Sequence, residues 1–223
     1  MAFESSVFIN CPFDYQYSNL LKPLIFTVIF LELEPQVSET KSSGNVRVEQ
    51  IKKLILSSKF SIHDISRSEA LNAGEFPRFN MPFEMGLDLG CQSFRKGRFG
   101  EKKCLILEKT RYHYQKVVSD IAGQDIEFHN DDPQILIRKV RNWFTSILGN
   151  HFSSPTVIWQ LYNEFYVDIT ETLKNKEGFS DDDVESIPYS NFISLAKKWI
   201  ATFKQTKNTE RISSKMKRRQ SRR

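Results

Sequence analysis

The chain has 223 residues, of which 39% are hydrophobic and 13% aromatic, enough for one large domain or one domain with an appendage. Phenylalanine is frequent and glycine scarce, which excludes a disordered or fibrous chain. The cysteines, Cys11, Cys91 and Cys104, are widely spaced and odd in number. They predict reduced thiols in a cytoplasmic protein rather than a disulfide framework.

The net charge of +5 is concentrated at the end of the chain. Residues 204–223 hold nine Lys or Arg and one Glu, so the part before them is mildly acidic. We expect a solvated, disordered basic tail. Binding of nucleic-acid phosphates is the alternative, although the segment has no interleaved aromatic residues for base stacking.

Neither a signal peptide nor a membrane span is expected. The stretch MAFESSVFIN lacks the basic region of a signal peptide. The longest apolar run, 20–33, contains Lys22, Pro23 and Glu32. A membrane span needs about 20 apolar residues, so this run is better interpreted as a buried helix.

Short apolar runs alternate with longer helical patterns along the first 150 residues. Strands are predicted at 6–10, 34–39, 59–66, 104–108 and 124–129. Helices are predicted at 16–33, 46–58, from about 81, and at 132–148, where Asp132 is an N-cap candidate and Pro133 the first helical residue. The alternation predicts an α/β domain over 1–150, with a flavodoxin-like, doubly wound, five-stranded parallel sheet.

After Gly149 the alternation stops. Helices are predicted at 153–176 and 187–203, joined by the acidic segment EGFSDDDVES. We expect a helical hairpin over 151–203, packed on the core or on a partner.

In doubly wound sheets the ligand site lies beyond the carboxyl ends of the strands. That rule nominates the helix that carries Glu84 and the residues that follow strands one, three and four. These residues are Asn10 to Asp14, Asp64 to Arg67, which includes Ser66, and Glu108 to Arg111.

The stretch RFNMPFEMGLDLG, 78–90, places one carboxylate among apolar side chains. Pro82 is tolerated in a first helical turn, so Glu84 is expected within that turn, with Asn80 on the same face. The helix dipole there favours an ionised carboxylate. Glu84 then either caps its own helix or serves a functional site, and its apolar surroundings favour the second reading.

An ionised carboxylate at this edge suits the chemistry of a sugar–base bond. It can stabilise an oxocarbenium-like centre or attack the anomeric carbon. The nicotinamide ring of NAD is already cationic before the bond breaks, so no general acid is obligatory and one Glu suffices.

The sequence RFNMPFEMG, 78–86, resembles the carboxylate-bearing helix of TIR-like nucleotide-binding domains from bacterial antiphage systems, including Pycsar-type effectors. It is also similar to the corresponding helix of nucleoside 2-deoxyribosyltransferases, where the Glu is the nucleophile. A second match to the Pycsar-type domains is VSDIAGQDIEFH, 118–129. The resemblance covers about 5–148 and implies Glu84 as the catalytic carboxylate, with Asp64 and the Asn10 loop near the sugar. It also implies a homo-oligomer or partner-triggered assembly.

The remaining candidates each have two readings. Asp64 binds a ribose hydroxyl or caps a loop. Arg67 and Arg78 hold phosphates or are simply solvated. The histidines show no metal-ligand spacing, so no metal site is expected.

The residues and the resemblance together predict an N-glycosidic-bond-cleaving enzyme, and the resemblance implies a role in bacterial antiphage defence. NAD or a related nucleotide would be its substrate rather than a cofactor, and the activity would be that of an NAD(P)+ nucleosidase or a deoxyribosyltransferase-like hydrolase. The alternative is a non-catalytic TIR-like module that senses a nucleotide or assembles with protein partners, motivated by aromatic residues in the C-terminal helices.

Overall fold

The computed structural model describes residues 3–38, 46–67, 76–116 and 118–220, with the backbone alone for 208 and 210–220. All five strands are parallel, in the order β2-β1-β3-β4-β5. This is the flavodoxin-like order, so the predicted fold class is confirmed. The strands are β1 (Ser6–Asn10), β2 (Glu34–Val37), β3 (Phe60–Asp64), β4 (Lys103–Glu108) and β5 (Ile126–Phe128).

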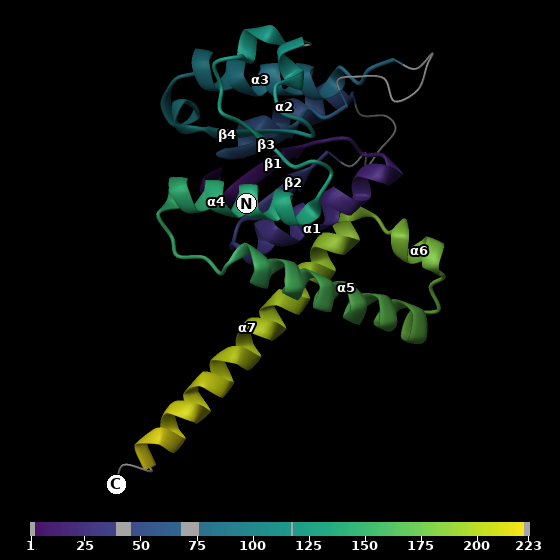
Figure 1. Cartoon of the computed structure of the whole chain (residues 1–223), viewed down its shortest axis with the longest axis vertical. Helices are drawn as coiled ribbons and strands as arrows, with labels where there is room; N and C mark the ends of the chain where they lie inside the picture. The colour runs from purple at the N-terminus through teal and green to yellow at the C-terminus, as the bar shows by residue number, and fades with distance from the viewer. Residues whose placement is uncertain (1–2, 39–45, 68–75, 117, 221–223) are drawn as a thin grey trace. The chain divides into compact units, whose positions relative to one another are not determined.

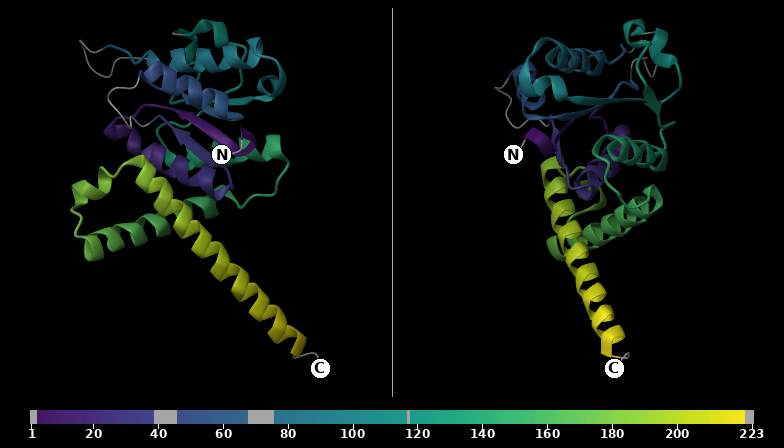
Figure 2. Two further views of the ribbon diagram at one scale, coloured as in Figure 1. Left: turned by 180° about the vertical axis from the view of Figure 1, so that it is seen from behind. Right: turned by 90° about the vertical axis from the view of Figure 1, so that its left-hand side faces the viewer.

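Helices cover both faces of the sheet. α2 (Arg47–Ser57) and α3 (Asn80–Phe94) lie on one face, and α1 (Ser18–Phe30) and α4 (Pro133–Leu148) lie on the other (Figure 1). The two further views in Figure 2 agree on this arrangement. Every residue of β1 and of β3 is buried as a result, as is usual for parallel strands that are covered on both faces.

The apolar run that begins at Leu20 forms the body of α1. All ten positions from Leu20 to Ile29 are buried, including the Pro23 ring. Within the described part of the chain, no helix combines the length and the apolar character needed to cross a bilayer.

The start and end of α4 follow their sequence signals. The Asp132 carboxylate accepts the backbone N–H groups of Gln134 and Ile135, and Pro133 occupies the first turn. Gly149 ends the helix in the left-handed region, at φ 67°.

The start of α3 differs from the prediction by one or two residues. The helix begins at Asn80, so Glu84 is its fifth residue and lies beyond the first turn. Pro82 is accommodated inside the first turn, where backbone N–H groups have no intrahelical acceptor. The placement of Glu84 in the first turn was therefore wrong.

A second compact unit begins at Asn163, rather than at residue 151. The helices of the C-terminal part are α5 (Pro155–Glu177), α6 (Asp181–Glu185) and α7 (Tyr189–Gln220). Within the second unit, the Phe165 ring packs edge-on against Phe192 and Trp199, and the Trp199 indole N–H donates to Asp168. These contacts join α5 and α7 as the predicted hairpin.

Two features of this unit differ from the predictions. The acidic segment between the helices contains the short helix α6, because Ser180 and Asp183 form a capping box at its start. The helix α7 continues to Gln220, where a disordered tail was predicted over 204–223. The stretch 204–220 has no glycine or proline to end a helix, and residues 221–223 lie outside the described part.

Candidate functional site

Glu84 borders a small pocket between α2 and α3. The pocket has a volume of about 110 Å³ and is lined by Arg47, Val48, Ile51, Asn80, Phe83, Glu84 and Leu87. Arg47 is the first residue of α2, and its Nε atom lies 3.8 Å from Oε1 of Glu84. The Glu84 side chain is 8% exposed, whereas that of Arg47 is 48% exposed. One nearly buried carboxylate therefore faces a cavity beside a solvated cation.

The environment of Glu84 disfavours its charged form. Burial raises the pKa of Glu84, and attraction to Arg47 and His63 offsets only part of that rise. The N-cap position of α3 belongs to Phe79, which makes no side-chain capping bond. A residue that only capped its helix would lie in the first turn and accept free N–H groups. The position of Glu84 does not fit that alternative.

The size of the pocket limits what enters it. Pockets for small-molecule ligands are commonly about 300–1,000 Å³. A volume near 110 Å³ corresponds to roughly four water molecules at about 30 Å³ each, which is the scale of a single sugar or base ring. A whole dinucleotide does not fit inside it.

Asp14, Arg67 and Arg78 come together as a charged cluster. Nη2 of Arg67 lies 3.4 Å from Oδ1 of Asp14, and Nη1 of Arg78 lies 3.7 Å from Oδ2. The backbone N–H of Arg78 donates to the Arg67 carbonyl at 2.9 Å, so the two segments are held together. Any phosphate bound by these arginines would compete with the Asp14 carboxylate.

Asp64 and Ser66 belong to a buried network. The Asp64 side chain is fully buried, accepts the Tyr17 hydroxyl, and lies 2.9 Å from Nε2 of His129. The Ser66 backbone N–H donates to Oδ1 of Asp64 at 2.9 Å, and its hydroxyl contacts the same oxygen. Burial raises the pKa of Asp64, but His129, Ser66 and Tyr17 outweigh this and lower it. The carboxylate is thus used within the fold, and no surface is left for a ribose hydroxyl.

Ser66, His129 and Asp64 do not form a nucleophile triad. Both the Ser66 hydroxyl, at 3.1 Å, and the Asp64 carboxylate approach the same ring nitrogen, Nε2. The other ring nitrogen accepts the backbone N–H of Asp131 at 3.1 Å. A triad requires the acid and the hydroxyl on opposite nitrogens.

Asn10 anchors the start of α3 to the two central strands. Its side-chain amide contacts Nδ1 of His63 and donates to the Met81 carbonyl, both at 2.9 Å. Asn10 and His63 are paired in register on β1 and β3. The amide is buried and does not line the Glu84 pocket.

The same network continues into a buried ion pair. His63 Nε2 lies 3.0 Å from Oδ2 of Asp88, and the Lys102 Nζ atom lies 3.0 Å from Oδ1. The Lys102 ammonium also donates to the carbonyls of Ile55 and Ser58. Burial raises the pKa of Asp88, and contacts with His63 and Lys102 more than reverse that rise.

The structure therefore divides the predicted site into three groups. Asn80 and Glu84 line a pocket, Asp14 with the two arginines forms a charged cluster, and Asn10, Asp64 and Ser66 belong to internal networks. Sequence reasoning missed Arg47, Tyr17 and His129. Arg47 could have been predicted from the rule that ligand sites lie beyond the carboxyl ends of the strands, because it is the first residue of the helix that follows β2.

Among the residues that the structure describes, no group of three or more His, Cys, Asp or Glu side chains is arranged to hold a metal ion. Comparison of the chain with models of known protein families, with curated proteins and with solved structures gave no match.

Proposed function

We propose that the protein cleaves the N-glycosidic bond of a nucleotide, NAD or a relative, with Glu84 as the carboxylate at the anomeric carbon. One observation carries the proposal. Glu84 is a nearly buried carboxylate with a raised pKa that borders a cavity, and its charged partner Arg47 is half-exposed. Carboxylates perturbed in this way cluster at functional sites.

The chemistry needs one carboxylate. The C1′–N bond breaks, and its electron pair goes to the nicotinamide, which leaves as a neutral molecule. Glu84 either stabilises the oxocarbenium-like centre or attacks it to form a glycosyl ester. Water then supplies the hydroxyl at C1′ and releases one proton to solvent.

The volume of the pocket defines how such a substrate would bind. One ring occupies the cavity beside Glu84 and Asn80, and the rest of the nucleotide lies outside it. Arg78, two residues before Asn80, is half-exposed and is the candidate for a phosphate contact. The resemblance of this helix to TIR-like domains suggests a role in antiphage defence.

A second candidate is a non-catalytic module that binds a nucleotide or a protein partner. The observations that favour it are the small volume of the pocket and the ion pair that Glu84 makes with Arg47. In that case the carboxylate joins α2 to α3 and performs no chemistry.

Release of nicotinamide from NAD by the full chain tests the proposal. The comparison uses wild type, Glu84→Gln and Glu49→Gln. Glu49 is an exposed glutamate on α2 paired with Lys52 at 2.8 Å, and it serves as the matched control. We expect release by wild type and by Glu49→Gln, and a loss of at least a hundredfold in Glu84→Gln.

Two results decide against catalysis. Release that is equal in wild type and Glu84→Gln removes the assigned role of Glu84. NAD binding by the full chain, without release and unaffected by Glu84→Gln, establishes the second candidate instead.

A further inference from the structure

A basic and aromatic surface lies at the amino ends of the central strands, at the edge of the sheet opposite to the predicted ligand site. The segment between α3 and β4, which contains the short 3-10 helix Gly97–Glu101, contributes most of it. The Lys59 N–H donates to the Phe3 carbonyl at 3.1 Å, and the Lys103 N–H donates to the Lys59 carbonyl at 3.0 Å, so the starts of β1, β3 and β4 are held side by side. We call this the amino-edge surface, and it consists of Phe94, Arg95, Lys96, Arg98, Phe99 and Lys103.

The amino-edge surface is strongly basic. Its four exposed cations are Arg95, Lys96, Arg98 and Lys103. Within the described part of the chain, none of the four forms an ion pair with a carboxylate. The neighbouring carboxylates, Glu4 and Glu101, both face Lys59 instead, with oxygens 2.6 Å and 3.9 Å from its Nζ atom. The surface therefore presents four positive charges that are not neutralised within the fold, which suits a polyanion.

The two arginines of this surface are held in place by aromatic rings. The guanidinium carbon of Arg98 lies 4.5 Å from the centre of the Phe3 ring and 5.2 Å from that of Phe99, and the Arg95 carbon lies 4.7 Å from the Phe99 centre. Gly97, between them, has φ 71°, which lets the chain turn so that both arginines reach the Phe99 ring. Stacking uses the flat face of a guanidinium and leaves the N–H donors at its edge for a phosphate.

Phe94, the last residue of α3, adds an apolar ring in contact with solvent. It is 87% exposed. Its ring lies along its own helix, because Gly90, one turn earlier, has no Cβ atom; one built there would be 3.5 Å from the ring. An exposed aromatic ring beside a row of cations is the arrangement on which a nucleobase stacks while its phosphates pair with the cations.

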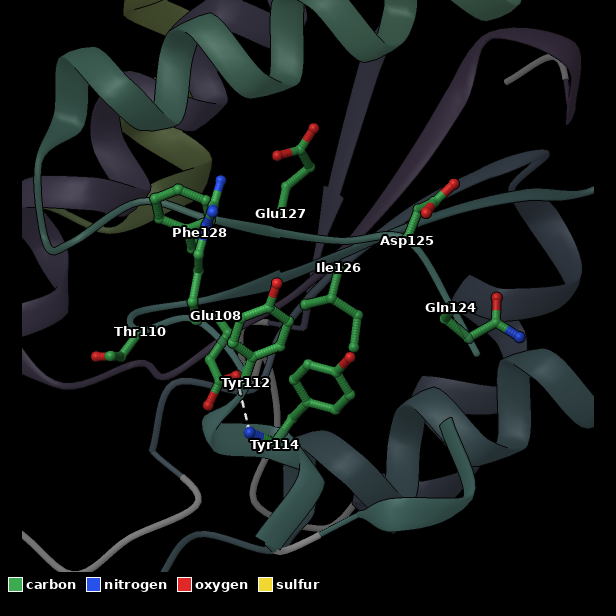
Figure 3. Close-up of a pocket in the computed structure, with 10 residues that line it drawn as sticks. Glu108, Thr110, Tyr112, Tyr114, Gln124, Asp125, Ile126, Glu127 and Phe128 are labelled. Carbon is green, nitrogen blue, oxygen red and sulfur yellow. Dashed lines mark hydrogen bonds between the residues drawn. The ribbon is translucent and has the colours of Figure 1, made fainter. Parts of the chain in front are cut away.

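The pocket at the carboxyl ends of β4 and β5 does not suit such a ligand (Figure 3). Its volume is about 430 Å³, but its carboxylates outnumber its cations. Glu108 accepts the Tyr114 N–H at 2.9 Å, the bond dashed in Figure 3, and its other oxygen lies 2.9 Å from Nδ1 of His113. Glu127 is paired with Lys139 at 2.6 Å. These charges are used within the fold, unlike those of the amino-edge surface.

We propose that the amino-edge surface binds single-stranded nucleic acid. Its four cations contact backbone phosphates, and a base stacks on the Phe94 ring. The binding is independent of Glu84 and of the chemistry proposed there.

Two other polyanions fit these residues less well. Binding to a membrane surface needs an apolar face of several side chains, whereas Phe3 is 8% exposed and is covered by Arg98, which leaves Phe94 as the exposed ring. A nucleic-acid duplex keeps its bases stacked on one another, so it offers phosphates but no free base for Phe94.

Fluorescence anisotropy of the full chain with a labelled RNA of about 12 nucleotides, and with DNA of the same sequence, tests the proposal. We expect saturable binding of at least one of the two strands, with a Kd at or below about 100 µM at about 100 mM salt. Phe94→Ala is expected to weaken the binding of the single strand at least about fivefold and to leave the binding of the matching duplex unchanged. Phe76→Ala is the matched control, because Phe76 is 90% exposed and lies outside this surface; it leaves both affinities unchanged.

The salt dependence of binding tests the role of the cations. A patch variant combines Arg95→Gln, Lys96→Gln and Arg98→Gln. Each neutralised phosphate of a single strand contributes about 0.7 to the slope of log affinity against log salt, so this variant is expected to reduce the slope by about 2. A tail variant removes three charges from the C-terminal basic segment instead, by Lys217→Gln, Arg218→Gln and Arg219→Gln, and is expected to change the slope less.

Four results overturn the proposal. They are no binding of either strand, wild-type affinity for single strands in Phe94→Ala, a tail variant that changes the slope as much as the patch variant, and binding to anionic vesicles without binding to oligonucleotides. Because Phe94 is exposed, Phe94→Ala is expected to fold even where the patch variant does not, and it then decides the proposal alone.

Discussion

The buried ammonium of Lys102 gives the sharpest stability prediction. Its side chain is 2% exposed, as is that of Asp88, which it faces at 3.0 Å. The ammonium donates its hydrogen bonds to two backbone carbonyls, those of Ile55 and Ser58. The substitution Lys102→Met keeps most of the aliphatic stem and removes the charge and all three contacts.

The expected cost follows from these contacts. At 3.0 Å and an effective dielectric constant near 20, the attraction between the two charges is about 5.5 kcal/mol, before the cost of burying them is subtracted. Breaking a buried pair by removing one partner costs about 3–5 kcal/mol, because the other charge stays buried. For a domain of this size we expect Tm to fall by about 6–20 °C.

Urea and thermal unfolding of wild type and Lys102→Met measure the effect. Lys59→Met is the matched control, because Lys59 pairs with Glu4 at 2.6 Å and the Glu4 side chain is 63% exposed. Surface pairs of that kind contribute about 0–1 kcal/mol. A loss below about 1 kcal/mol in Lys102→Met, or a loss no larger than in Lys59→Met, refutes the reasoning.

Four further predictions follow from the titratable groups. If Glu84 acts as an ionised carboxylate, nicotinamide release falls on acidification at a pH above the usual glutamate pKa, because burial raises the pKa of Glu84; initial rates from acid to neutral pH locate this limb. The raised pKa also means that folding disfavours the charged form, so Glu84→Gln is expected to leave Tm unchanged or higher at neutral pH, and a clear fall in Tm would assign Glu84 a structural role. Tyr17→Phe removes the hydroxyl that donates to buried Asp64 and is expected to cost about 1.5–3 kcal/mol in urea unfolding, whereas no loss would show that the bond contributes little. Folding lowers the pKa values of Asp64 and Asp88, so the stability that these carboxylates contribute is present above the unfolded-state aspartate pKa and is lost as pH falls through their folded-state pKa values. Measuring Tm against pH in the acid range tests this, and a Tm that does not fall over that range would contradict the lowered pKa values.

The sheet was predictable because local patterns determine it. SVFIN and FSIHD are short segments that contain aromatic and β-branched residues, and both form fully buried parallel strands. The start of α4 was equally local, since Asp132 and Pro133 act within one turn. The start of α3 was shifted because Phe79 supplies no capping side chain to mark it.

The sequence predicted at which edge of the sheet the candidate site lies, but not which side chains contact one another there. The sequence does not reveal that Asp64 meets Tyr17 and His129, because these partners are 47 and 65 positions away. A carboxylate after a strand looks the same whether it faces a ligand or an internal hydroxyl. Lys102 was missed for the same reason, since a lysine before a strand carries no mark of burial.

The amide of Asn10 has a mechanical consequence for α3. It holds the Met81 carbonyl while contacting the neighbouring strand through His63. A slide or rotation of the helix would leave a sealed-off amide without its acceptor, a penalty of about 1–3 kcal/mol. Glu84, three residues after Met81, is consequently positioned by the middle of the sheet. A conservative replacement of Asn10 is expected to leave the protein folded but to make the orientation of the Glu84 side chain less fixed.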